Sequence, residues 1–141
     1  MLCWGDNASG QLGQGDVTPR SGPVTVQAPP AVGLASWSRG SCLRTATGQV
    51  WCWGEDLDLD GQGTRGPRPP TRIEGLDDAR GIGAGGVVTR LCADGSCVAG
   101  TSIDHRCAVR SGGGFVCWGN NINSQLGRSG PALSRVMGRL P

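Results

Sequence analysis

Apolar residues along the chain fall in short groups that are separated by glycine-rich turns. No window of ten or more residues repeats its apolar side chains with the 3.6-residue period of an α-helix, so we expect almost no helix. Short β-prone groups bounded by Gly and Pro are typical of strands joined by tight turns. The pattern therefore predicts an all-β fold.

Two segments are predicted to be β-hairpins with a cysteine at each end. One runs from 42 to 52 around Thr47-Gly48, and the other from 107 to 117 around Gly112-Gly113. Opposed residues on antiparallel strands have Cα atoms about 4.5–5.5 Å apart, which a disulfide spans. Asp94-Gly95 is a strong turn signal for a third, tighter hairpin. We therefore expect three local disulfides: Cys42–Cys52, Cys92–Cys97 and Cys107–Cys117.

The same cysteines allow two other interpretations. Reduced cysteines pack well as small apolar side chains. A zinc site could take Cys92, Cys97, His105 and Cys107, but this spacing matches none of the common zinc patterns, and Cys117 is a better partner for Cys107. Disulfides are favoured, and they predict an extracellular, cell-surface or periplasmic location for the parent protein.

A tripeptide, Cys-Trp-Gly, recurs at positions 3, 52 and 117, each time followed by a polar loop. The spacings suit repeats of about 40–50 residues once one insertion is allowed. A unit of this size cannot bury its own apolar face, so such units stack on their neighbours in propellers or solenoids. The chain is therefore predicted to be a repeat protein.

The first copy, CWGDNASGQLGQGDVTPRSGPVTV, resembles the regulator of chromosome condensation repeat, whose Trp-Gly-x-Asn-x-x-Gly-Gln-Leu-Gly-x-Gly loop is followed by Pro-x-x-Val. The third copy keeps most of this pattern with Ser124 in place of the first loop Gly, whereas the second copy, residues 52–64, has lost Gln-Leu-Gly. The segment from His105 to Val109 resembles a strand of bacterial members that have paired cysteines. The motif residues that carry the resemblance are Trp4, Gly5, Asn7, Gly10, Gln11, Leu12, Gly13, Trp53, Gly54, Trp118, Gly119, Asn121, Gln125, Leu126 and Gly127.

This resemblance implies a β-propeller whose loops bind another protein, without enzymatic activity. Members of the family include a chromatin-bound exchange factor for a small GTPase and a secreted inhibitor of β-lactamases. Nucleotide exchange is not carried over to this chain, because it needs loops of a full propeller and fold analogy would be its only basis.

The chain is too short for a whole propeller, so we expect a partial one, an open arc of two to three blades. The expected division is a partial repeat at 1–30, a degenerate repeat at 31–80, a degenerate half-repeat at 81–100 and a truncated last repeat at 101–141. Cys3 is the second member of a pair whose first member would precede Met1, which indicates a fragment of a longer protein. Its exposed blade faces could also support self-association, and a non-functional gene remnant is the alternative.

Three motifs suggest chemistry but fit it poorly. Asp56, Asp58 and Asp60 resemble the first half of a calcium loop, yet Pro67 replaces the glutamate that such a loop requires. Residues 81–86 fit the dinucleotide pattern Gly-x-Gly-x-x-Gly, but a strand-like segment follows instead of a helix. The resemblance assigns them to a glycine turn. His105 is expected to be a structural hydrogen-bonding residue. We therefore expect no enzyme and no cofactor, with calcium or zinc binding as the alternative function.

Charge and hydropathy exclude two classes of partner. All 13 basic residues are Arg, but they are scattered and offset by 11 acidic residues to a net charge of +2. Nucleic-acid binding is therefore not expected. No stretch approaches the ~20 apolar residues of a membrane span. The 26 Gly and 9 Pro could suggest disorder, but the five Trp and seven Cys favour a folded protein.

Overall fold

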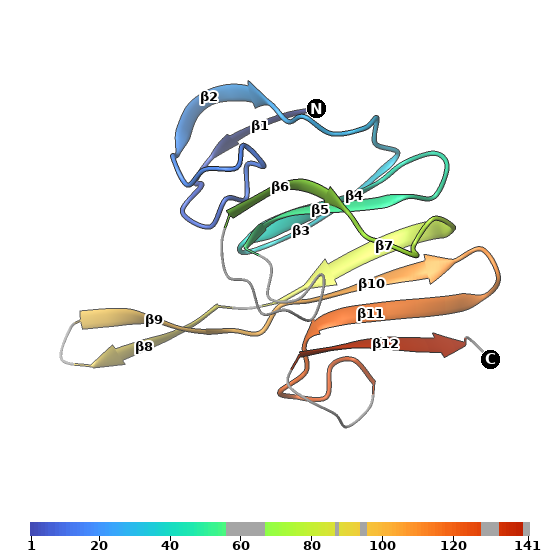
Figure 1. Ribbon diagram of the computed structural model, residues 1–141. Coiled ribbons are helices and arrows are strands. Elements are labelled where there is room, and N and C mark those ends of the chain that lie inside the picture. Colours follow the sequence, from blue (N-terminus) through green and yellow to red (C-terminus); the bar gives the residue numbers. More distant parts are fainter. Residues whose placement is uncertain (56–66, 87, 94–95, 128–132, 140–141) are drawn as a thin grey trace.

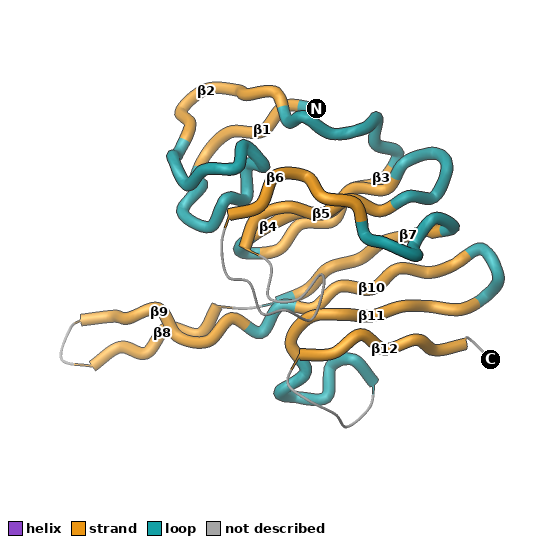
Figure 2. Tube along the Cα trace, viewed as in Figure 1, coloured by secondary structure: helices purple, strands orange, loops and turns teal. Residues whose placement is uncertain are grey.

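The computed structural model describes residues 1–55, 67–86, 88–93, 96–127 and 133–139 (Figures 1 and 2). Of residues 88–93, 96–102 and 133–139 it describes the backbone alone. The described part consists of strands and loops without a helix, which confirms the all-β prediction. The described strands are β1 (Leu2–Gly5), β2 (Arg20–Thr25), β3 (Gly33–Trp37), β4 (Gly40–Arg44), β5 (Val50–Glu55), β6 (Pro67–Arg72), β7 (Ala79–Gly85), β8 (Val88–Ala93), β9 (Ser96–Ser102), β10 (His105–Arg110), β11 (Gly114–Asn120) and β12 (Leu133–Arg139).

The strands form two four-stranded sheets and two antiparallel pairs. One sheet has the order β3-β4-β5-β6 and the other the order β7-β10-β11-β12. The pair β1-β2 packs against the first sheet, and β3 and β4 contact β7 of the second sheet. The pair β8-β9 is inserted between β7 and β10 and extends away from both sheets (Figure 1). This arrangement is the expected partial propeller, an arc of sheets that does not close.

Both long hairpins have the predicted register. Cys42 lies opposite Cys52 on β4 and β5, and Cys107 lies opposite Cys117 on β10 and β11. Each pair is a disulfide with a Cα–Cα distance of 4.0 or 4.1 Å. Strands β8 and β9 bring Cys92 and Cys97 to opposite backbone positions, but the side chains of this third pair lie outside the described residues.

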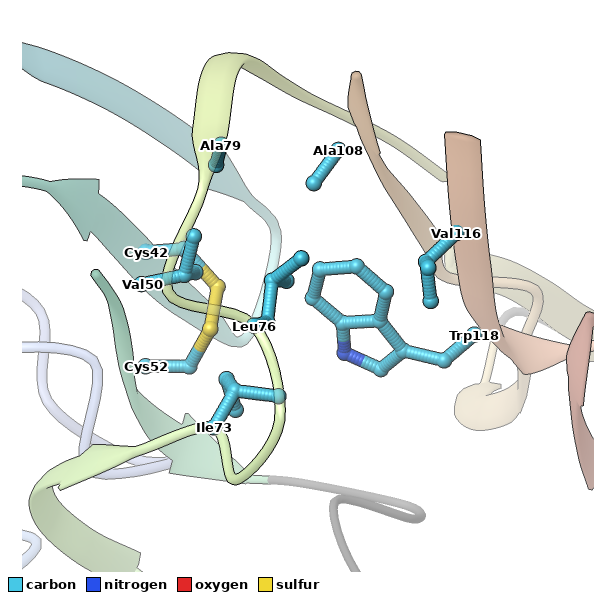
Figure 3. Close-up of a cluster of buried hydrophobic side chains, with 9 residues drawn as sticks. All are labelled: Cys42, Val50, Cys52, Ile73, Leu76, Ala79, Ala108, Val116 and Trp118. Atoms are coloured by element: carbon cyan, nitrogen blue, oxygen red, sulfur yellow. A yellow bond between two sulfur atoms is a disulfide. The ribbon is translucent and has the colours of Figure 1, made fainter. Parts of the chain in front are cut away.

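The main core lies between the two four-stranded sheets (Figure 3). Trp118 reaches from β11 toward Leu76, and 3% of its surface is exposed. The Cys42–Cys52 disulfide closes the same core from the first sheet. The full set of buried residues is Cys42, Val50, Cys52, Ile73, Leu76, Ala79, Ala108, Val116 and Trp118. Because each sheet presents only one side to this core, neither could bury it alone.

A smaller core joins β1-β2 to the first sheet. Val26, Leu43 and Trp53 are buried in it, and Cys3 packs against them at the edge. Alternation along β5 explains why one strand serves both cores, since Cys52 faces the second sheet and Trp53 faces β1-β2.

The glycine-rich segment 81–86 is not the glycine turn that the resemblance implied. Residues 79–85 form β7, which pairs with β10 along its whole length, so that Gly83 lies opposite Cys107 and Gly85 opposite His105. A Cβ at Gly85 would lie 3.1 Å from the His105 ring, so a glycine suits this close approach. The division into repeats at 1–30, 31–80, 81–100 and 101–141 remains a prediction.

Candidate interaction surface

The loop of the first copy is built around the side chain of Asn7, which is fully buried. Its Oδ1 accepts a hydrogen bond from the Leu12 amide at 2.9 Å. Its Nδ2 lies 2.9 Å from the carbonyl oxygen of Asp16 and 3.1 Å from that of Thr18. One amide side chain therefore links three separate points of the loop. It supplies the partners that these backbone groups need once they are buried.

The loop of the third copy repeats this geometry. Asn121 is buried, and its Oδ1 accepts a hydrogen bond from the Leu126 amide at 2.9 Å. The glutamines match as well: Oε1 of Gln11 accepts from the Ser9 amide at 2.8 Å, and Oε1 of Gln125 accepts from the Asn123 amide at 2.9 Å. Both glutamines thus act as internal braces of their own loops.

Positive φ angles complete the match between the two loops. Gly10 has φ +75°, and Ser124, which replaces it in the third copy, has φ +57°. A non-glycine residue rarely adopts this region, so the rest of the loop must impose it on Ser124. The two loops therefore share one backbone course despite the substitution.

The three motif tryptophans do not gather at one site. Trp53 and Trp118 lie in the two cores between neighbouring units, whereas Trp4 is 61% exposed on β1. The indole N–H of Trp53 donates to the carbonyl oxygen of Gln11 at 2.9 Å. The glycine loop of one unit thus receives the tryptophan of the next, which is a packing role rather than a chemical one.

The glycines of Cys-Trp-Gly also serve the packing. Gly5, Gly54 and Gly119 have φ of +111°, +98° and +110°. A Cβ at Gly119 would lie 2.6 Å from the carbonyl oxygen of Asp104, and one at Gly54 would collide with the backbone of Arg39. After Trp53 and Trp118 the strand therefore passes too close to a neighbouring turn for a side chain, whereas a Cβ at Gly5 would meet nothing within 4 Å among the described residues.

A buried polar junction joins the two four-stranded sheets. Asp104 is 2% exposed, and its Oδ1 accepts a hydrogen bond from the Ser38 hydroxyl at 3.2 Å. The guanidinium of Arg106, also 2% exposed, lies 3.8 Å from the centre of the Trp37 ring. Such cation–π contacts gain strength when they are removed from water. Sequence reasoning missed this junction, because Ser38 and Asp104 are far apart in the chain.

Charges around one shallow hollow of the described surface are mixed in sign. This hollow of about 550 Å³ is lined by Arg44, Asp77, Asp78 and Arg80 among others. Arg72 and Arg110 bind its two aspartates at 2.6 and 2.8 Å. An anionic polymer would find no continuous basic surface in this hollow.

Three described ionisable groups have shifted pKa values: Asp16, Cys3 and Arg72, whose pKa is raised by its hydrogen bond to Asp77. The pKa of Asp16 lies below its usual value, mainly because its carboxylate accepts a hydrogen bond from the Thr18 amide and secondly because Arg20 binds it. Burial raises the pKa of the Cys3 thiol, so less of it is thiolate at neutral pH. Among the side chains that the structure describes, Cys3 is the free cysteine.

The structure does not bring the candidate metal ligands together as a site among the residues that it describes. Asp56, Asp58 and Asp60 lie outside the described residues. The alternative zinc set loses a ligand, because Cys107 is bound to Cys117 and a disulfide sulfur is not a thiolate. Within the ranges that the structure describes, no three His, Cys, Asp or Glu side chains gather as a metal site. Nδ1 of His105 is buried and meets no hydrogen-bond partner in those ranges, and the structural hydrogen-bonding role of this residue stays a prediction.

Comparison with known proteins supports the repeat interpretation. Residues 1–42 match the sequence model of the regulator of chromosome condensation (RCC1) repeat. A search among curated proteins gave no match. Among solved structures, human WBSCR16 is similar with a TM-score of 0.64 and 20% sequence identity, over 99% of this chain and 34% of that one. At this identity the likeness shows the fold alone, and the chain spans about a third of the length of that protein.

Proposed function

This chain carries a regulator of chromosome condensation (RCC1) repeat, and from that premise we propose that it is a non-enzymatic scaffold that binds another protein. The observation that carries the proposal is that the motif side chains have structural roles. Asn7, Asn121 and the two glutamines brace loops, and Trp53 and Trp118 fill cores between units. Rigid loops on a packed framework are typical of binding surfaces.

The inserted hairpin β8-β9 is the part of this framework that we propose to meet the partner. The first sheet joins β3 to β4 through Ser38 and Arg39 alone, whereas the second sheet places the whole hairpin between β7 and β10. No other described strand pairs with β8 or β9, so both outer edges are open. Open edges accept a strand from another protein through backbone hydrogen bonds.

The two described disulfides support an extracellular, cell-surface or periplasmic location for the parent protein. Disulfides persist in oxidising compartments and are rare in reducing ones. In the part of the chain that the structure describes, no helix is long and apolar enough to cross a membrane.

Removing the hairpin tests this function. In the variant, residues 88–102 are replaced by two glycines, and the partner is the protein that cross-links to β8 or β9 of the intact chain in its native extract. We expect the variant to keep its thermal unfolding midpoint within a few degrees, because the backbone of β8-β9 extends away from both four-stranded sheets (Figure 1). Its affinity for that partner, measured by calorimetry, should fall on the order of a hundredfold or more.

A matched control replaces Gly112-Gly113 in the β10–β11 turn by Asn-Gly, which alters another hairpin without removing it. This control should bind as the intact chain does. Unchanged binding by the hairpin deletion would contradict the proposed surface, and turnover of a substrate by the purified chain would contradict the scaffold function itself.

A further inference from the structure

Most arginines whose side chains the structure describes are tied to a partner. Six of these eight have one: Arg20, Arg39, Arg68, Arg72, Arg106 and Arg110. The other two are Arg44 and Arg80. Nη1 of Arg44 donates a long hydrogen bond of 3.3 Å to the carbonyl oxygen of Thr45. Among the residues that the structure describes, no carboxylate binds Arg44 or Arg80, so both guanidinium groups are available to a ligand.

Both of these arginines line the same hollow of about 550 Å³. Arg44 is the last residue of β4 in the first sheet, and Arg80 lies near the start of β7 in the second. The hollow therefore lies where the two four-stranded sheets meet. Its other walls are the β4–β5 turn, the connection from β6 to β7 and the β10–β11 turn.

The two carboxylates in this hollow already have cationic partners. Arg72 donates two hydrogen bonds to Oδ1 of Asp77, at 2.6 and 3.2 Å. Nε of Arg110 lies 2.8 Å from Oδ1 of Asp78. Since each aspartate is compensated by an arginine of its own, the walls of the hollow keep two positive charges without an acidic partner.

Backbone hydrogen bonds hold these walls in place. The Ala79 amide donates to the Gly48 carbonyl oxygen at 3.0 Å, and the Ser111 amide donates to that of Asp78 at 2.9 Å. Both hairpin turns are thus tied to the connection between β6 and β7. A site whose walls are already fixed loses less conformational entropy when a ligand binds.

We propose that this hollow binds an acidic segment of another protein, with one carboxylate at Arg44 and a second at Arg80. A guanidinium matches a carboxylate because its N–H groups form two parallel hydrogen bonds with the two oxygens. A protein segment suits the site better than a small molecule, since small-molecule sites enclose most of the ligand surface and this hollow is shallow.

This inference rests on the proposed scaffold function and adds a second contact to it. Figure 1 shows β8-β9 on one side of the molecule and the β4–β5 and β10–β11 turns on the other. A partner that used both surfaces would therefore extend along the arc of sheets. The two contacts can be tested separately, because neither includes residues of the other.

The test is a titration of the isotope-labelled full chain with the peptide Glu-Gly-Glu, blocked at both ends, followed by NMR. The backbone amide signals of Arg44, Thr47 and Arg80 should shift, with a dissociation constant on the order of 1 mM. The matched neutral peptide Gln-Gly-Gln should leave them in place. Raising the salt concentration from about 50 to about 500 mM should weaken binding about threefold or more, because the charges are near the surface.

Two substitutions remove the charges one at a time. Arg44→Gln and Arg80→Gln each keep a long polar side chain, and each should weaken binding of the acidic peptide about threefold to tenfold. The matched control is Arg20→Gln, which makes the same change in net charge at a loop of the first copy. It should bind as the unmodified chain does, and circular dichroism should show all three variants folded.

Three results would overturn the proposal. The acidic peptide could leave the amides around the hollow unshifted. Arg20→Gln could weaken binding as much as the two variants of the hollow, which would mean a general effect of net charge. Inorganic phosphate could bind more tightly than the peptide, which would make this a site for a small anion.

Deletion of β8-β9 separates this proposal from the scaffold function. The chain without residues 88–102 should bind the acidic peptide as the intact chain does. Loss of peptide binding in Arg44→Gln and Arg80→Gln together with unchanged partner binding by the deletion would support the hollow and contradict the hairpin surface. The reverse pair of results would support the hairpin surface and contradict the hollow.

Discussion

The side chain of Asn7 is fully buried in a loop whose neighbouring residues Asp6 and Ala8 are exposed. It satisfies the Leu12 amide and two carbonyl oxygens at once. Removing one partner of a buried hydrogen bond costs more than the bond itself contributes, since the other partner stays buried without water.

Asn7→Ala should therefore lower the free energy of unfolding by about 2–3 kcal/mol. Urea unfolding followed by tryptophan fluorescence measures the change. The matched control is Asn123→Ala, which alters an exposed asparagine of the equivalent loop and should change stability by less than about 0.5 kcal/mol. Equal effects of the two substitutions would mean that the buried amide does not hold the loop.

The motif residues show what single positions of the sequence can and cannot predict. The match of Asn7 to Asn121 and of Gln11 to Gln125 was visible in the sequence, and their hydrogen bonds are equivalent in the structure. The exposure of Trp4 could not be read from Cys-Trp-Gly, because it depends on which unit lies in front of it and not on the motif. Ser124 stands in place of the first loop glycine, and its φ of +57° preserves the turn.

At the scale of elements, each four-stranded sheet contains one hairpin closed by a disulfide. The bonds Cys42–Cys52 and Cys107–Cys117 each join residues ten positions apart, so each closes a small loop. Restricting the unfolded chain in this way stabilises the fold by about 2–3 kcal/mol per bond. The first bond lies in the core between the sheets, and the second lies on the far side of the second sheet.

Replacing both cysteines of a bond by alanine should lower the thermal unfolding midpoint in each case. Loss of the Cys42–Cys52 bond should lower the midpoint more than loss of the Cys107–Cys117 bond. The first double substitution also leaves a cavity in the shared core. Calorimetry measures both, and Cys3→Ala serves as control, since Cys3 is free and half-buried. A midpoint that is unchanged by reduction of the intact chain would contradict this role of the disulfides.

Hairpins were the elements that the sequence predicted best, because their signals are local. The cysteine register of β4-β5 and β10-β11 follows from a turn with equal arms, and both registers are confirmed. Strand β7 was missed because its sequence, ARGIGAG, has a single β-branched residue, and it becomes a strand by pairing with β10 more than twenty positions later. The hairpin β8-β9 separates these two strands in the sequence, so local sequence signals could not predict that they pair.

At the scale of the whole molecule, the units are joined by two different kinds of contact. Trp53 and the Gln11–Gly13 loop join β1-β2 to the first sheet, and a larger core with the Ser38–Asp104 bond and the Trp37–Arg106 contact joins the two sheets. The smaller junction buries fewer side chains, so it should open at a lower free energy than the larger one. Repeat proteins separate in this way because each unit contacts only its neighbours.

Gly13→Val should therefore loosen β1-β2 while the two four-stranded sheets stay folded. The added side chain would overlap the Trp53 ring, and overpacking of a tight contact costs about 1–3 kcal/mol. In hydrogen exchange, the amides of β1 and β2 should exchange on the order of tenfold faster or more, with those of β10 and β11 unchanged. Gly15→Val is the matched control, because Gly15 has φ +78° and nothing within 4 Å of its Cβ. Faster exchange in all strands of Gly13→Val would show that the units unfold together and that the small junction is not a separate point of opening.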